Sequence, residues 1–346
     1  MLREARWLVE AGHEVTIHAF DRDQSLVGEE VVEGVRIVRH RVGKTAYGGT
    51  LSTWLGLRRF RRSVLAKMGD VDLIHCHDAD TLPLVKRTKT PVMFDMHDLH
   101  HTWIRMGHPR SWIRRFISGR MKRTMLKQAR SASAVVTSSE GLQVWLDEHG
   151  IGATIVENRP ESQSNPPLPD RFTVGFLGRV RDATSFSLLI DAIAQIPESD
   201  RPFLRIAGDG TAFDEVAELV SRSDLDAEIS GSFSAEDLSG LMAEISLMFA
   251  MYDPERENIA AGALPVKMFD AANHGRPSIV TAGVPMGDLC EAEGLGQAVP
   301  WADPQALIAA LMEMQGSAVR LVHGAERERT RFLEAVNQLF NRILIE

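Results

Sequence analysis

Short runs of β-branched and other apolar residues alternate with helical patterns along the whole chain. The candidate strands of the first half are residues 14–20, 35–40, 71–76, 91–96, 133–138 and 153–157, and those of the second half are residues 172–178, 203–210, 227–233, 245–251, 277–283 and 296–301. Helical stretches of about 10–20 residues separate most of these runs, which is the pattern of βαβ units. The alternation predicts an α/β protein with mostly parallel, doubly wound sheets.

One proline-rich stretch interrupts the alternation. Residues 158–171, NRPESQSNPPLPDR, contain four prolines and cannot continue a helix or a central strand. We therefore predict a Rossmann-like domain over residues 1–160, a linker over 161–171 and a second Rossmann-like domain over 172–323. Residues 324–346 are expected to form a last, long helix with no strand after it.

The chain begins inside a helical pattern, LREARWLVEAGHE, in which Gly12 is the signal for the C-terminal cap. A doubly wound domain normally opens with a buried strand and a tight glycine turn into its first helix. Either the sequence lacks an upstream segment, or the N-terminal domain lacks its first strand. The sequence leaves both readings open.

Composition narrows the class of protein. Of the 346 residues, 44% are hydrophobic and 25% are charged, as in soluble globular proteins. No apolar run reaches the roughly 18–20 residues needed to span a bilayer, and the charged N-terminus is no signal peptide. The two cysteines, Cys76 and Cys290, exclude a disulfide framework. We expect a cytoplasmic protein.

The net charge of −8 hides an asymmetry between the two halves. Residues 1–168 carry 25 Lys and Arg against 19 Asp and Glu, a balance of +6, and the remainder carries 14 against 28, a balance of −14. Halves of opposite sign predict two domains with different partners.

The stretch ENIAAGALPVKMFDAANHGRPSIV, residues 257–280, combines a helix start with a lysine and a carboxylate. Pro265 fixes a first helical turn, whose N–H groups have no partner within the helix. Small residues before it let a ligand approach the backbone, so this is a candidate phosphate site. Lys267 would add a full charge, and Asp270 lies on the same helical face. The plainer alternatives are a solvated lysine and an i,i+3 ion pair between the two.

The order of several motifs resembles the retaining group 1 (family 4) glycosyltransferases, which have the GT-B fold of two Rossmann-like domains facing a cleft. The resemblance covers nearly the full chain. It is carried by the motifs REARWLVEAGHEVTIHAF, DVDLIHCHD, VMFDMHDLH, VGFLGRV, LRIAGDG and PVKMFDAANHGRPSIV. It implies transfer of a sugar from a UDP- or GDP-sugar to a glycan or lipid-linked acceptor, with retention of configuration and without a metal or other cofactor. The last helix would then cross back onto the N-terminal domain.

The same resemblance implies a donor site in the C-terminal domain. Its residues would be Gly178, Arg179, Gly208, Asp209, Ala263, Leu264, Lys267 and Asp270. Asp270 takes the place of a carboxylate that accepts hydrogen bonds from the ribose, and Arg179 that of an arginine which grips the diphosphate. Two positions depart from the family pattern: Gly262 stands where a first glutamate is common, and Thr184 where a helper lysine is common. Lys267 could supply the missing charge.

On the acceptor side, the resemblance gives His97 the role of a catalytic histidine that contacts the donor sugar near the reacting carbon. The alternative is a histidine satisfied structurally by Asp98. His75 and His77 share one face of a strand, but we find no third and fourth metal ligand at a usable spacing. The DAD triplet at 78–80 matches a metal motif of another fold, and helix capping is its expected role here. We predict no metal site.

Basic and aromatic residues concentrate between Leu99 and Ser139, a stretch without a single acidic residue. Residues 54–67 repeat the style. A basic, amphipathic helix of this kind suits an anionic membrane surface, and the alternative is a solvated face over a buried stripe. Nucleic-acid binding is disfavoured by the negative total charge. The membrane hypothesis places the enzyme on the inner face of the cell membrane, and its patch consists of Trp112, Arg114, Arg115, Arg120, Lys122 and Arg123.

Two other functions remain open at this point. One is a non-catalytic partner or regulatory subunit that keeps the fold, which Gly262 and Thr184 favour. The other is a sugar epimerase of the same fold, against which the absence of a clear acid/base carboxylate set counts.

Overall fold

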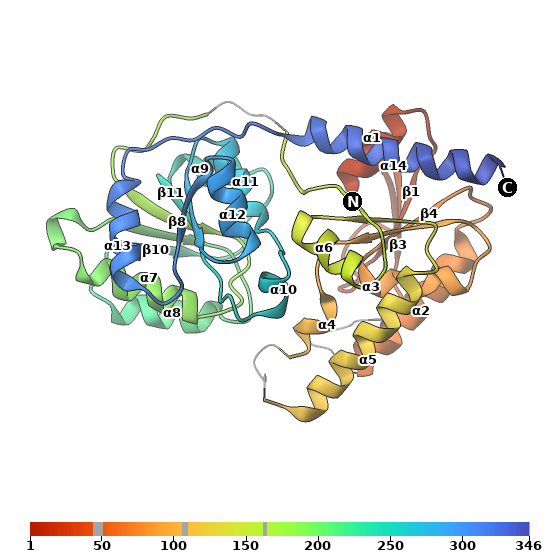
Figure 1. Ribbon diagram of the computed structural model, residues 1–346, viewed down its shortest axis with the longest axis horizontal. Coiled ribbons are helices and arrows are strands. Elements are labelled where there is room, and N and C mark those ends of the chain that lie inside the picture. The colour runs from red at the N-terminus through yellow and green to blue at the C-terminus, as the bar shows by residue number, and fades with distance from the viewer. Residues whose placement is uncertain (44–50, 106–109, 162–164, 346) are drawn as a thin grey trace. The chain divides into compact units, whose positions relative to one another are not determined.

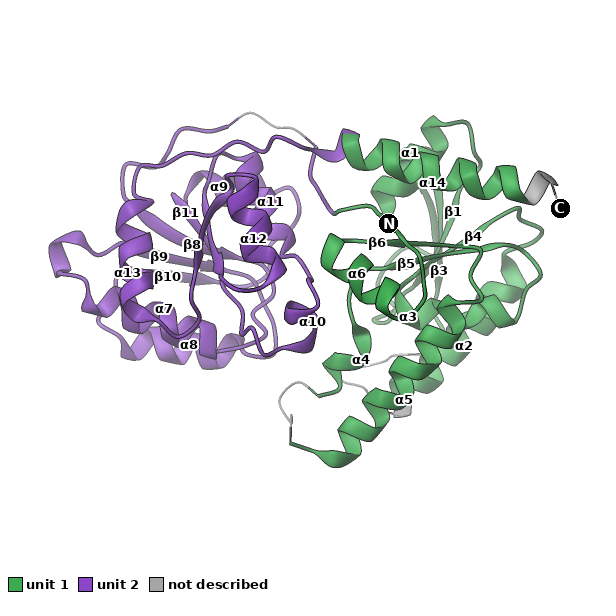
Figure 2. Cartoon of the chain, viewed as in Figure 1, with its two compact units in different colours: residues 1–157, 327–346 green, residues 158–326 purple. Residues whose placement is uncertain are grey.

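The computed structural model describes residues 1–43, 51–105, 110–161 and 165–345. Two compact units are present (Figure 2). Unit 1 comprises residues 1–157 and 327–346, and unit 2 comprises residues 158–326. The last helix, α14 (Ala325–Ile345), thus begins in unit 2 and belongs mostly to unit 1.

Unit 2 is built on one six-stranded sheet with the order β10-β9-β8-β11-β12-β13, in which every pair of neighbours is parallel. All six strands were predicted from the sequence. They are β8 (Thr173–Leu177), β9 (Phe203–Ala207), β10 (Ala227–Ser230), β11 (Leu247–Ala250), β12 (Ser278–Thr281) and β13 (Gly296–Val299). β8, β11 and β12 are buried throughout, as expected of parallel strands covered on both faces.

Helices cover both faces of this sheet (Figure 1) and give it two separate hydrophobic cores. One core includes residues of α7 (Thr184–Gln195), α8 (Phe213–Arg222) and α13 (Pro304–Glu313). The other includes residues of α9 (Leu238–Ala243), α10 (Glu257–Ala260), α11 (Val266–Asn273) and α12 (Pro285–Ala292). This is the doubly wound architecture that the sequence pattern predicts.

The strands of unit 1 fall into two sheets. One is β1-β3-β2, formed by β1 (Thr16–Phe20), β2 (Glu29–Val32) and β3 (Val35–His40). The other is β4-β5-β6-β7, formed by β4 (Ile74–His77), β5 (Val92–Met96), β6 (Ala134–Thr137) and β7 (Thr154–Ile155). Within the described chain no strand joins β1 to β4, which agrees with the prediction that the N-terminal sheet is short of a strand.

The antiparallel strand β2 was not predicted. It pairs with β3 through a two-residue turn at Glu33 and Gly34, both of which have positive φ, +51° and +80°. Such a turn suits the twist of a hairpin. The sequence signal was weak because a glutamate rather than an asparagine or aspartate precedes the glycine.

Helix α14 is tied to unit 1 by a buried aromatic side chain. Phe332 is fully buried and contacts the rings of Trp7, on α1 (Leu2–Glu10), and His75, on β4. Further along, the buried carboxylate of Glu328 accepts a 2.8 Å hydrogen bond from the backbone N–H of Glu157. The remaining helices of unit 1 are α2 (Leu51–Lys67), α3 (Asp78–Thr81), α4 (His100–Trp103), α5 (Trp112–Ala129) and α6 (Glu140–Glu148). No helix of the described chain is long and apolar enough to cross a bilayer.

Two buried arginines hold the chain around the proline-rich stretch onto unit 2. Arg159 has no exposed surface, forms two 2.7 Å hydrogen bonds to Glu293 and lies 4.4 Å from the ring of Phe269. Arg276 donates to the carbonyl oxygens of Pro166 and Pro167 at 2.8 and 2.7 Å. The described part of this stretch is therefore fixed by charge-assisted hydrogen bonds.

Arg159→Ala should lower the free energy of unfolding by about 3–5 kcal/mol, because it leaves the Glu293 carboxylate without its partner in a largely buried site. Urea denaturation followed by circular dichroism measures the change. Arg222→Ala is the matched control: Arg222 forms an exposed i,i+4 pair with Glu218, so its loss should matter by no more than about 0.5 kcal/mol. Equal effects of the two substitutions would contradict the prediction.

Candidate functional site

Lys267 lies in the first turn of α11, after the N-cap residue Pro265. Its ammonium nitrogen is shielded from solvent and has no hydrogen-bond partner. It lies 3.1 Å from the centroid of the Phe176 ring and would be 3.6 Å from a Cβ atom placed on Gly178. The solvated-lysine alternative is therefore wrong. An uncompensated buried ammonium is costly, and the adjacent N–H groups of the helix start attract anions.

The charges around Lys267 act in opposite directions. Burial, followed by the charge of Arg181, places the pKa of Lys267 well below its ordinary value, while Asp270 raises it. Asp270 is half-buried on α11, but no hydrogen bond or ion pair joins it to Lys267 in the described structure. The ion-pair alternative for these two residues is therefore wrong as well.

Two glycine turns meet beside this lysine, at the carboxyl ends of β8 and β9. Gly178 and Gly208 have φ values of +126° and +152°, and a Cβ on Gly208 would lie 1.8 Å from the carbonyl oxygen of Gly178. The backbone N–H of Val180 donates to the carbonyl oxygen of Asp209 at 2.8 Å. The Gly-Asp-Gly segment is thus more than an isolated turn, because its shape holds the neighbouring loop in place.

Four basic side chains gather near these turns. The predicted Arg179 forms an ion pair with Asp209, and both side chains are about half exposed. Arg181 acts electrostatically on both Lys267 and Tyr252, and Arg256 lies 5.9 Å from the Tyr252 ring. Burial raises the pKa of Tyr252 to about 12, although Arg256 and Arg181 lower it. Sequence reasoning missed Arg181 and Arg256, the first of which lies only two residues beyond Arg179.

The segment before α11 explains the glycine that stands in place of a carboxylate. Gly262 has φ +99°, in the region that side chains disfavour. The N–H of the predicted Ala263 donates to the carbonyl oxygen of Asn258 at 2.9 Å and is thus engaged, while the predicted Leu264 is half-buried. Thr184, the other departure, is the first residue of α7.

In unit 1, the predicted His97 follows β5 and contacts a carboxylate that sequence reasoning did not single out. Its Nε2 lies 3.1 Å from Oδ2 of Asp95, which is 4% exposed. Burial lowers the pKa of His97, but the charge and hydrogen bond of Asp95, aided by Asp78, raise it to about 9. Burial likewise raises the pKa of Asp95, and His97 and His77 outweigh this and lower it.

Asp98 and Asp78 have roles other than those predicted. Asp98 accepts hydrogen bonds from the N–H of Leu99 and from Nε1 of Trp103, and not from His97. The side chain of Asp78 does not cap α3. It accepts a 3.2 Å hydrogen bond from the N–H of His97 and lies 3.4 Å from His100, so the capping prediction for 78–80 is wrong.

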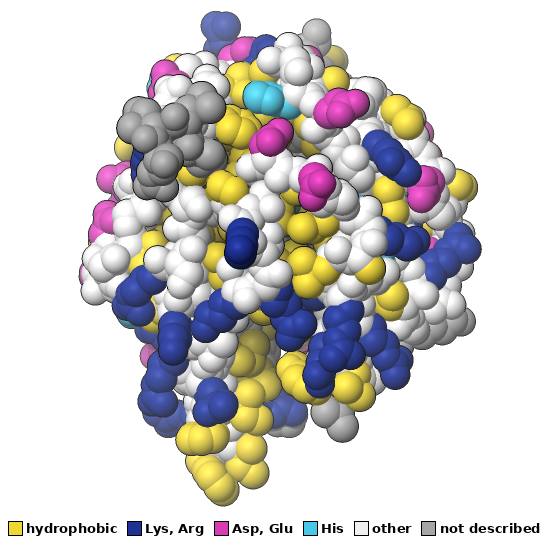
Figure 3. All heavy atoms as spheres, turned by 90° about the vertical axis from the view of Figure 1, so that its right-hand side faces the viewer, with side chains coloured by type: hydrophobic (Ala, Val, Ile, Leu, Met, Phe, Trp, Pro, Cys, Tyr) yellow, Lys and Arg dark blue, Asp and Glu magenta, His cyan; other side chains and the backbone are white. Residues whose placement is uncertain are grey.

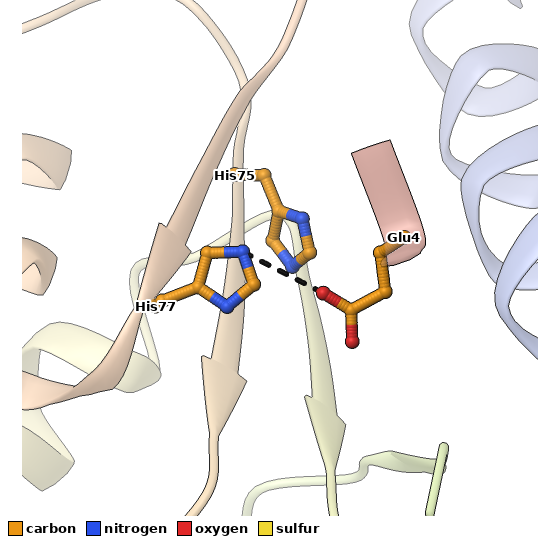
Figure 4. Close-up of side chains that lie close together, drawn as sticks. All are labelled: Glu4, His75 and His77. Carbon is orange, nitrogen blue, oxygen red and sulfur yellow. Dashed lines mark ion pairs between the residues drawn. The ribbon is translucent and has the colours of Figure 1, made fainter. Parts of the chain in front are cut away.

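The structure brings a carboxylate to the two histidines of β4 (Figure 4). The rings of His75 and His77 both face Glu4, from α1, and His77 Nε2 lies 3.7 Å from Glu4 Oε2. The ligand atoms of these three residues lie within 4.8 Å of one another, as do those of His77, Asp95 and His97. The expectation that no third metal-ligand type comes near is therefore wrong. The shortest contacts in both groups join an acid to a base, which protons on histidine satisfy, so we assign neither group to a metal.

A basic and apolar surface lies over α5 (Figure 3). Hydrophobic side chains project at the lower end of the view, with Lys and Arg around them. The most exposed of them are Trp112, at 76%, and Phe116, at 65%. The stripe predicted along this helix is exposed at Ile113, Ile117 and Met121 but buried at Met125, so α5 presents an apolar tip and not one continuous apolar face.

The cations of this surface differ in exposure. Arg115, Arg120 and Arg123 are exposed. Arg114 donates to the carbonyl oxygen of Ile104, and Lys122 lies over the Trp145 ring at 4.7 Å. The same style recurs on α2, where Trp54 is 54% exposed.

Comparison with known families now assigns the chain. Residues 1–158 match the glycosyl transferase 4-like domain, and residues 171–316 match the glycosyl transferases group 1 family. The two matches together span most of the sequence. The chain belongs to the group 1 glycosyltransferases.

Individual relatives of this glycosyltransferase are distant. The succinoglycan biosynthesis protein ExoL of Rhizobium meliloti (strain 1021) is 24% identical over 337 residues, which cover 89% of this chain and 80% of that protein. The sucrose-phosphate synthase of Thermosynechococcus elongatus has a TM-score of 0.72 at 18% identity and covers 99% of this chain and 92% of its own. Anabaena Alr3699/HepE in complex with UDP and glucose has a TM-score of 0.69 at 16% identity and covers 100% and 95%. These structures confirm the predicted GT-B fold.

Restoring the carboxylate in this glycosyltransferase by Gly262→Glu should lower the free energy of unfolding by about 1–2 kcal/mol, because the residue has φ +99°. Thermal unfolding measures the loss. The matched control is Gly240→Glu, on α9, where φ is ordinary and a Cβ would meet open space. That control should be neutral or stabilising, since glutamate is the better helix former. A Gly262→Glu protein as stable as the parent would contradict the account.

Proposed function

We propose that this glycosyltransferase binds the diphosphate of a nucleotide-sugar donor between the Gly178 turn and the start of α11. The observation that supports it most directly is the buried ammonium of Lys267, which lacks a hydrogen-bond partner. A diphosphate would supply the missing negative charge. Arg179, Asp209 and Gly208 belong to the same site in this proposal, with Asp270 on the ribose.

The proposed chemistry is departure of the nucleoside diphosphate with retention of configuration at the sugar. Lys267 and the N–H groups of the helix start stabilise the negative charge that develops on the leaving phosphate. The acceptor hydroxyl attacks from the same face, and the leaving phosphate takes its proton. In the acceptor-side unit, His97 acts on the transferred sugar.

UDP is the nucleotide that we propose. Anabaena Alr3699/HepE is titled as a complex with UDP-glucose, and Staphylococcus aureus TarM as a complex with UDP. Both relatives show only the fold here, so GDP remains the comparison ligand in the experiment. A glycan or a lipid-linked sugar is the proposed acceptor.

Lys267→Met should weaken UDP binding by about tenfold to a hundredfold, the equivalent of one charge-assisted hydrogen bond. The free energy of unfolding without ligand should be unchanged or higher by about 1 kcal/mol, because methionine removes a buried charge. Isothermal titration calorimetry and urea denaturation measure the two quantities. A lysine with a structural role would give the opposite stability result.

A labelling experiment sharpens this test, since Lys267 is the only lysine after Lys127. A lysine with a lowered pKa reacts with acylating reagents near neutral pH, and UDP should protect it in mass-spectrometric mapping. Arg222→Met serves as the control with unchanged UDP affinity. No binding of UDP or GDP to the parent protein would favour the non-catalytic subunit, and interconversion of sugar epimers would favour the epimerase.

We further propose that the α5 tip binds an anionic membrane surface, which would bring the enzyme to a lipid-linked acceptor on the inner face of the cell membrane. The exposed aromatic side chains and the cations around them support this partner. Aromatic side chains insert at the headgroup boundary, and each nearby cation contributes about 1 kcal/mol on an anionic membrane.

In flotation assays, the parent protein should bind vesicles that contain phosphatidylglycerol and not vesicles of phosphatidylcholine alone. Trp112→Ser/Phe116→Ser and Arg114→Glu/Arg115→Glu should each reduce this binding at least about tenfold. Val144→Ser, which changes a 51% exposed apolar residue on α6, is the matched control and should bind like the parent. Failure of the parent to bind anionic vesicles would refute the membrane proposal and leave the donor site untouched.

A further inference from the structure

The backbone of His97 is fixed from two sides at the end of β5. Its N–H donates to Asp78 Oδ1 at 3.2 Å, and its carbonyl oxygen accepts from the hydroxyl of Ser138 at 3.0 Å. Asp78 itself has φ +61°, a conformation that non-glycine residues rarely adopt. A strained residue that anchors a neighbouring backbone is characteristic of functional positions.

The ring of His97 is fixed through one of its two nitrogens. Nε2 lies 3.1 Å from Asp95 Oδ2 and 3.2 Å from His77 Nδ1, and the His97 ring lies parallel to that of His77 with centroids 5.5 Å apart. Nδ1 makes no hydrogen bond within the described chain, and the side chain is 25% exposed. Nδ1 is therefore the nitrogen that can meet a substrate.

The charges around His97 favour its cationic form. Within the described chain, the basic groups within 4 Å of the Asp95 carboxylate are three imidazoles and no lysine or arginine. A buried carboxylate without a cation is costly. Two more carboxylates act on His97, Glu4 from α1 and Asp78 from α3.

We propose that Asp95 is a positioning residue for sugar transfer, which holds His97 as an imidazolium with its Nδ1–H directed at the substrate. In this role His97 donates a charged hydrogen bond to a sugar hydroxyl or a phosphate oxygen and does not act as a base. The inference rests on the proposed function for the identity of that substrate. The raised pKa of His97, about 9, agrees with it.

The pH dependence follows from the sign of this shift. A cationic donor is present below the pKa of His97 and is lost as the pH rises through about 9. Without the Asp95 carboxylate, the pKa should fall toward the ordinary histidine value of about 6.5. His75, His77 and His100 are the other titratable groups facing this cluster, and burial lowers the pKa of His75 to about 3.

The first experiment measures the His97 ring directly by NMR titration, with its signals assigned by their absence in His97→Gln. Asp95→Asn should lower the His97 pKa by at least about one unit. Asp98→Asn, which removes the neighbouring carboxylate bonded to Leu99 and Trp103, should leave it unchanged. A parent His97 that titrates in the ordinary range, or one that Asp95→Asn does not shift, would overturn the proposal. The parent titration alone suffices should Asp95→Asn not fold.

The second experiment is the pH profile of kcat for UDP-sugar turnover. The alkaline limb of the parent should lie near pH 9 and should move toward about 6.5 in Asp95→Asn, with a larger loss of kcat at alkaline pH than at pH 6 and little change in the KM of the donor. A uniform loss at every pH would indicate a structural role and overturn the proposal. Absence of turnover in the parent, with the NMR result as expected, would count against the proposed function and not against the Asp95–His97 pair.

Metal analysis supplies the last decision. Mass spectrometry of the protein as purified should find no stoichiometric Zn²⁺, and added Zn²⁺ should not displace the His97 proton below about micromolar concentration. One equivalent of Zn²⁺ that is lost in Asp95→Asn would instead show that Asp95, His77 and His97 bind metal, which would overturn the imidazolium.

Discussion

A single buried ammonium sets the constraint around which the carboxyl end of the unit 2 sheet is arranged. Lys267 has no hydrogen-bond partner, yet it lies against a glycine turn and an aromatic ring. Packing of the β8 and β9 turns requires glycine at Gly208, because a Cβ there would overlap the Gly178 carbonyl. A desolvated charge of this kind weakens the folded protein without ligand and strengthens its attraction for an anion in a site of low dielectric constant. Stability without ligand is thus reduced in favour of binding.

Unit 1 treats its buried charge in the opposite way. Asp95 is surrounded by imidazoles and forms its closest ion pair with His97, so its charge is compensated before any substrate arrives. An uncompensated cation suits a ligand that brings its own charge, such as a diphosphate. A compensated imidazolium suits a neutral sugar, because it can donate a directed hydrogen bond without a change in net charge on binding.

Sequence patterns identified the strands of unit 2 and Lys267 because both depend on local signals: apolar runs with period two or continuous burial, and a proline before a helical turn. They missed the strand β2, whose turn has a weak signature, and Arg181, whose relation to Lys267 spans 86 positions. Glu4 approaches His77 only through the packing of α1 on the sheet. Asp95 was predictable in principle. Residues two apart on a strand share a face and adjacent residues do not, so His97 at the end of β5 was better matched with Asp95 than with Asp98.

Gly262 and Lys267 together decide between an enzyme and a partner subunit that merely keeps the fold. The missing carboxylate at Gly262 first favoured the subunit, but the positive φ there shows that the loop has a conformation in which a glutamate side chain is disfavoured. The carboxylate is therefore absent for a reason of backbone geometry, which leaves the phosphate contacts intact. A subunit without ligand would gain stability from an apolar residue at position 267. The retained buried ammonium has a physical explanation only if an anion binds beside it, and a nucleotide diphosphate is the anion that the donor of a group 1 glycosyltransferase supplies.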